Sequence, residues 1–127
     1  MINLPDLPRI LDKKEAKVTT PILEWFQKNH HSSCAIEIKN TKKNTIPKKS
    51  LQEHQYLALR DANGPQGIIH KLSDEARRKQ PFDSFQLVNV PAYVVACFST
   101  YHYCLVFPID QWNGAHYEDD ALYRIDI

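Results

Sequence analysis

A carboxylate and an ammonium group stand two residues apart in the segment 34–39, which reads C-A-I-E-I-K. Alternate side chains of a β-strand share one face, so a strand here would present Glu37 and Lys39 together and turn two isoleucines the other way. A carboxylate can bind a hard cation, and a nearby lysine can orient or deprotonate water and stabilise developing negative charge. This pair is the first candidate for a catalytic site.

A basic loop and an amphipathic helix follow this strand. Capping-box spacing of Ser50 and Glu53 predicts a helix over 50–62. Its expected inner stripe comprises Leu51, Gln55, Ala58, Leu59 and Ala62. An unpaired buried amide costs about 1–3 kcal/mol, so a glutamine on this stripe requires a polar partner. We interpret Glu37, Lys39 and Gln55 as one site, although charges on one strand face are also typical of a solvated edge strand.

The order of these residues resembles a known pattern. Glu37-Ile38-Lys39, a basic loop rich in Thr and Asn, and then Glu53-His54-Gln55 resemble the PD-(D/E)xK nuclease superfamily, and more narrowly the Holliday-junction resolvases of the RecU type. The resemblance covers roughly residues 15–112 and is strongest over 36–55. It implies a metal-dependent phosphodiesterase acting on DNA, with Mg²⁺ as the cation and Mn²⁺ as a substitute. Within it, Lys39 is the catalytic lysine, Glu37 is a metal ligand and Gln55 belongs to the active site.

The resemblance also implies a second carboxylate, and Asp83 is the best candidate. It follows Pro81 and Phe82 and so resembles the "PD" element of the superfamily. The aspartate strand normally precedes the E-x-K strand, whereas here it follows. We therefore expect a hairpin, residues 68–90, that has migrated in sequence and places strand 82–88 directly beside strand 34–39. The alternative is that Asp83 is a turn residue and the site is degenerate.

A third carboxylate comes from the predicted first helix, residues 12–29. Its apolar stripe comprises Leu11, Val18, Ile22, Trp25 and Phe26, and Glu15 falls on this stripe. Nucleases of this class often present a glutamate from the first helix to the metal, which makes Glu15 a candidate catalytic residue and metal ligand. The alternative is a capping box formed with Asp12.

Basic residues gather in two segments although the net charge of the chain is only +1. The predicted phosphate contacts are Lys42, Lys43, Lys48, Lys49, Arg77 and Arg78. A basic loop beside a metal site suits phosphate binding, and a solvated loop is the alternative. The overall charge argues neither for nor against nucleic acid.

Length and composition bound the remaining possibilities. A chain of 127 residues suits one domain, 1–127, with an extended arm over 1–11 and an acidic tail over 114–127. Three cysteines in apolar runs predict buried thiols in a reducing compartment. There is no apolar run of membrane-spanning length and no signal-peptide pattern. We expect a cytoplasmic protein with no membrane partner.

The predicted fold class is α/β, with helices 12–29 and 50–62 packed on a mixed sheet of about five strands in a restriction-endonuclease-like core. A hairpin of strands 82–88 and 92–98 would turn at 89–91, and strand 102–107 would pair with the second of these. We expect a homodimeric endonuclease that resolves junction or other branched DNA. A repair nuclease or exonuclease, and a catalytically degenerate DNA-binding module, are the alternatives.

Overall fold

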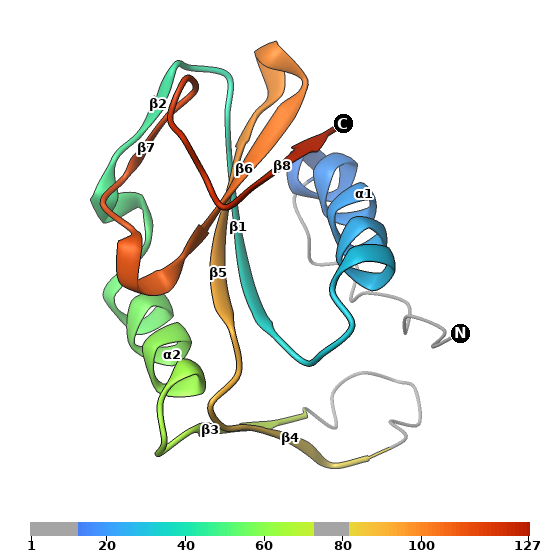
Figure 1. The fold of residues 1–127 in the computed structure, drawn as a ribbon, viewed down its shortest axis with the longest axis vertical. Helices are drawn as coiled ribbons and strands as arrows, with labels where there is room; N and C mark the ends of the chain where they lie inside the picture. Colours follow the sequence, from blue (N-terminus) through green and yellow to red (C-terminus); the bar gives the residue numbers. More distant parts are fainter. Residues whose placement is uncertain (1–12, 73–81) are drawn as a thin grey trace.

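The computed structural model describes residues 13–72 and 82–127, with the side chains of 13–17 outside that description. Two helices, α1 (Lys13–Asn29) and α2 (Glu53–Asn63), lie on opposite faces of a four-stranded sheet (Figure 1). The class is mixed α/β, as predicted. α1 continues through Pro21 without interruption, and α2 begins three residues later than the predicted helix.

The main sheet has the strand order β1-β5-β6-β8. Its strands are β1 (Ala35–Thr41), β5 (Ala92–Phe98), β6 (Tyr103–Pro108) and β8 (Tyr123–Asp126). β1 runs parallel to β5, and the other two pairs are antiparallel, so the sheet is mixed. All seven residues of β5 are buried, which confirms its predicted central place and its pairing with β6. The main sheet has four strands instead of about five.

Each helix covers its own apolar core. On one face, Val18, Ile22 and Phe26 of α1 pack with the odd-numbered positions of β5 and with Ile36 and Ile38 of β1. On the other face, Leu51, Leu59 and the even-numbered positions of β5 form a second core. The period of two along each strand and of nearly four along each helix produces this two-sided burial. The predicted inner stripe of α2 is correct except at Ala58, which is exposed.

The predicted hairpin of 82–88 with 92–98 is wrong. β4 (Ser84–Leu87) pairs instead with β3 (Ile68–Lys71) in a separate antiparallel ladder, so the hairpin expected over 68–90 does form, but it is not paired with β1. Between β4 and β5 the chain turns at Asn89, whose φ is +52°. The Asn89 and Val90 backbone N–H groups donate to carbonyls at the end of α2, those of Gly64 and Ala62, both at 3.0 Å. These bonds direct β4 away from β5.

The C-terminal segment contributes to the fold, which the prediction of an acidic tail over 114–127 missed. β7 (Ala115–His116) pairs with β2 (Thr45–Ile46), and β8 forms the fourth strand of the main sheet. Ile125 of β8 is 2% exposed and belongs to the core beneath α1. Acidic residues occupy the turn before β8, where solvent is available, and the strand is held by its pairing with β6, by Ile125 and by the packing of Tyr123 on Trp25.

The three cysteines are free thiols. Cys97 and Cys104 are buried and lie opposite each other on β5 and β6, while Cys34 is half-buried. A hydrogen bond with Cys104 and burial both raise the pKa of Cys97, and burial raises the pKa of Cys34. The prediction of buried thiols is thus confirmed for Cys97 and Cys104.

Candidate functional site

Glu37, Lys39 and Gln55 form a connected polar cluster between β1 and α2. The Lys39 ammonium donates to Gln55 Oε1 at 2.9 Å, and Gln55 Nε2 donates to Glu37 Oε1 at 3.0 Å. Lys39 Nζ and Glu37 Oε1 are 3.6 Å apart, and the two side chains are 20% and 32% exposed. The predicted shared face of Glu37 and Lys39, and the predicted polar partner of Gln55, are both confirmed.

The start of α2 fixes the position of Gln55. Gln52 is the N-cap, and it exchanges hydrogen bonds with Gln55 in a capping box. Gln55 Oε1 accepts from the Gln52 backbone N–H at 3.1 Å in addition to the Lys39 ammonium. The predicted box of Ser50 with Glu53 is wrong, because Ser50 belongs to the 3-10 helix η1 (Lys48–Ser50) before α2. One glutamine therefore both caps the helix and joins the charged pair.

This arrangement holds an ammonium group in a defined place while leaving it accessible to water. Lysine has three donors, and the bond to Gln55 uses one of them. The partial exposure of Lys39 and Glu37 limits the net stability of the ion pair to about 0–1 kcal/mol. The ion pair therefore adds little to the stability of the fold, and the ammonium group remains available to an anion.

Asp83 does not join this cluster through strand pairing. The prediction that strand 82–88 lies beside strand 34–39 is wrong, because β1 pairs with β5 and β4 pairs with β3. Asp83 is exposed, and its backbone carbonyl accepts the Leu72 N–H at 2.8 Å where the β3–β4 ladder ends. The pairing of β4 with β3 leaves the expected adjacency of Asp83 and Glu37 unformed.

Three other predicted site residues fall outside the described part of the chain. Arg77 and Arg78 lie in 73–81, and the side chain of Glu15 lies in the undescribed portion of α1. The α1 backbone packs on the β1 face that carries Ile36 and Ile38, which is opposite to the face of Glu37.

The described residues supply one carboxylate of the expected metal site. Within 13–72 and 82–127, no group of three or more His, Cys, Asp or Glu side chains is arranged to hold a metal ion. Glu37 has the oxygen donors that Mg²⁺ prefers, and its exposure allows water ligands. On their own, the described side chains do not make up a complete metal site.

The basic loop lies next to the cluster, where β1 ends. Lys42 and Lys43 are exposed between β1 and β2, and Lys48 and Lys49 are exposed on η1. The segment 99–101 holds this loop in place by three hydrogen bonds. They are Ser99 Oγ to the Thr41 carbonyl at 3.0 Å, Thr100 Oγ1 to the Lys42 carbonyl at 2.9 Å, and Tyr101 OH to Asn44 Oδ1 at 2.7 Å. Sequence reasoning missed these anchors, because nothing local in S-T-Y signals such a distant partner.

No family model, curated protein or solved structure matches the chain. Neither helix of the described ranges has the length and apolar character that crossing a lipid bilayer requires. Any assignment of function to this chain therefore rests on its own residues and their geometry.

Proposed function

We propose that the protein is a Mg²⁺-dependent endodeoxyribonuclease that hydrolyses phosphodiesters of junction or other branched DNA. The observation that carries the proposal is the hydrogen-bonded cluster of Glu37, Lys39 and Gln55 beside an exposed basic loop. These three residue types, on a strand and the following helix, are those that the resemblance to RecU-type resolvases implies.

Each member of the cluster has a role that follows from its contacts. The Lys39 ammonium stabilises negative charge that develops on the phosphate and orients the attacking water. Gln55 accepts from Lys39 and donates to Glu37, so it fixes the distance between the two charged groups. Glu37 is the proposed metal ligand, and Glu15 and Asp83 are the residues to test for the remaining carboxylates.

A junction has two equivalent phosphates, so its symmetric cleavage requires two active sites related by a two-fold axis. We therefore propose that the protein acts as a homodimer on this substrate. The exposed lysines of the basic loop would hold the backbone by charge alone, without reading base sequence.

Incubation of the protein with Mg²⁺ and end-labelled four-way junction, duplex and single-stranded DNA tests the proposal. We expect paired cuts in the junction, and a loss of at least about a hundredfold in rate for Lys39→Ala with Mn²⁺ affinity and thermal stability retained. Lys28→Ala, at the exposed end of α1, is the matched control and should cleave normally. Full activity of Lys39→Ala would refute the catalytic assignment. Cutting from DNA ends would identify an exonuclease instead.

A DNA-binding module without nuclease activity is the second candidate. The observation in its favour is that Glu37 is the sole carboxylate of the described cluster, while Asp83 lies on a strand that is not paired with β1. It predicts salt-dependent junction binding with neither cleavage nor measurable Mn²⁺ affinity. Calorimetric titration of the protein and of Glu37→Gln, Asp83→Asn and Glu15→Gln with Mn²⁺ distinguishes the two candidates.

A further inference from the structure

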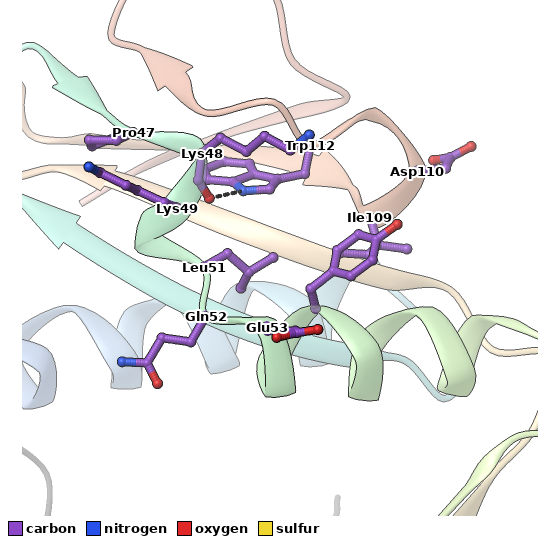
Figure 2. A pocket seen from close by; sticks show the side chains of 10 residues that line it. Pro47, Lys48, Lys49, Leu51, Gln52, Glu53, Ile109, Asp110 and Trp112 are labelled. Carbon is purple, nitrogen blue, oxygen red and sulfur yellow. Dashed lines mark hydrogen bonds between the residues drawn. The ribbon is translucent and has the colours of Figure 1, made fainter.

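A hollow of about 840 Å³ opens beside the first turn of α2, and we call it the Trp112 pocket. Three segments surround it: the turn around η1, the start of α2, and η3 (Ile109–Gln111) with the tryptophan that follows (Figure 2). Its volume falls within the roughly 300–1,000 Å³ of typical small-molecule sites. The pocket is therefore large enough to hold one nucleotide.

Two aromatic residues give the pocket its apolar walls. Trp112 is held firmly, since its indole N–H donates to the Lys48 carbonyl at 3.1 Å and its ring packs edge-on against Phe107 at a centroid distance of 5.8 Å. Tyr56, on the second turn of α2, also lines the pocket and is 38% exposed. An exposed aromatic ring beside a rigid apolar floor offers a stacking surface for a planar ligand.

Charges of opposite sign occupy different sides of the same pocket. Lys48 and Lys49 lie on the η1 side, while Glu53 lies at the start of α2 and Asp110 lies on η3 (Figure 2). All four side chains are exposed and hydrated before a ligand binds. A matching ligand combines an anionic group, a flat apolar body and hydrogen-bond donors on the edge away from the anion.

The pocket shares residues with the proposed DNA site. Lys48 and Lys49 belong both to the basic loop and to the pocket wall. Gln52 also lines the pocket, and its backbone N–H donates to the Gln55 oxygen that binds Lys39. The pocket therefore borders both the basic loop and the start of the helix that positions Gln55.

We propose that the Trp112 pocket receives a single unstacked guanine of a DNA strand whose backbone lies on the basic loop, an inference that rests on the proposed DNA-binding function. Guanine carries two adjacent N–H donors on its pairing edge, which match the two acceptor oxygens of Glu53. Thymine has a single donor between two carbonyl oxygens, and these repel a carboxylate. Tyr56 stacks on the base, and Lys48 and Lys49 contact the phosphate.

The test uses isotope-labelled full-length protein without metal, titrated with a short oligothymidylate and with the same strand carrying one central guanine. The NMR signal of the Trp112 indole N–H reports on the pocket. That of Trp25, which packs on Phe26 and Tyr123, is the internal reference. We expect the Trp112 signal to shift at a roughly tenfold lower concentration of the guanine strand than of the thymine strand. A tenfold preference is at the lower end of the discrimination that a base contact with two hydrogen bonds provides.

Two variants separate stacking from recognition of the base. Tyr56→Ala should weaken binding of both strands by roughly tenfold. Glu53→Gln should abolish the preference for guanine and leave binding of the thymine strand intact. The matched control is Glu24→Gln on the exposed surface of α1, which should retain the preference.

Two outcomes overturn the inference. The first is a Trp112 indole signal that does not shift although the guanine strand binds to another part of the protein. The second is an equal response to both strands that Glu53→Gln does not alter. Cleavage assays keep this result apart from the endonuclease proposal. A selective guanine response with no cutting in Mg²⁺ refutes only the nuclease, whereas junction cutting with a silent Trp112 refutes only the pocket assignment.

Discussion

An exchange of the side chains at positions 37 and 55 tests the hydrogen bond that joins β1 to α2. In Gln55→Glu, a carboxylate oxygen replaces the Nε2 donor that lies 3.0 Å from Glu37 Oε1. A charge-assisted bond is lost, and two like charges face each other. In the double variant Glu37→Gln with Gln55→Glu, the introduced amide can again donate to a carboxylate, with the direction of the bond reversed.

The expected magnitude follows from the geometry. The lost bond contributes about 1 kcal/mol at this partial exposure. Repulsion of two charges at this distance costs roughly 1.4–2.8 kcal/mol for an effective dielectric constant of about 40–80. A new ion pair with Lys39 and a favourable charge at the helix N-terminus offset about 1–2 kcal/mol of this. We expect Gln55→Glu to lose about 2 kcal/mol, which corresponds to a fall in Tm of roughly 6–10 °C.

Thermal unfolding of the parent, both single variants and the double variant at pH 7 completes a mutant cycle. Glu37→Gln alone should lose about 1 kcal/mol, because its neutral amide weakens the bond to Gln55. The double variant should return to within about 1 kcal/mol of the parent, so the coupling free energy should be close to 2 kcal/mol. At about pH 3 a proton on one of the facing carboxyl groups removes the repulsion, and the deficit of Gln55→Glu should shrink. Additive effects of the two single changes would show that Glu37 and Gln55 are not bonded in solution.

Three further predictions follow from the described contacts. Neutralising Lys42 and Lys43 together should weaken binding to every DNA sequence alike, and reduce the log–log salt slope by about 0.9 for each lost phosphate contact; an unchanged slope would place DNA elsewhere. Cys97 and Cys104 should resist a thiol reagent at pH 8 in the native state and react only on unfolding, because burial makes both thiols inaccessible and the raised pKa of Cys97 keeps that thiol protonated. Gly114→Ala should lower Tm by several degrees in a melting experiment, since φ is +81° and the added Cβ would lie 2.9 Å from the Ile46 carbonyl oxygen.

Side-chain periodicity predicted the helices and strands that build most of the core, but not the contribution of Ile125. The alternation of charged and apolar residues in 35–39 predicted the two faces of β1. The glutamine on the apolar stripe of α2 correctly indicated a polar partner on the neighbouring strand. The unbroken apolar run of 92–98 likewise identified the central strand. These signals are local, because the side chains of one strand or one helix show by themselves which face of that element is buried.

Pairing partners were less predictable, because they depend on the direction in which the chain leaves each turn. The segment 89–91 reads as a hairpin turn, but hydrogen bonds from Asn89 and Val90 to the end of α2 direct β4 away from β5. The hairpin expected over 68–90 did form as the β3–β4 ladder, but its place away from β1, and with it the place of Asp83, depends on those distant bonds. β8 was missed because four residues with one buried side chain carry little periodic signal.

The position of β1 in the sheet affects the order of folding. β5 and β6 are joined by the short segment 99–102 and can pair early, whereas β1 reaches β5 only after α2 and the β3–β4 ladder have been accommodated. Closing the long loop between β1 and β5 carries a large entropic cost, which is not offset by contacts formed before the two strands pair. Release of β1 should therefore be a partial unfolding event of lower free energy than global unfolding, with faster amide exchange in 35–41 than in 92–98. Because Glu37 and Lys39 lie on β1, the cluster exists only in molecules in which β1 has paired with β5.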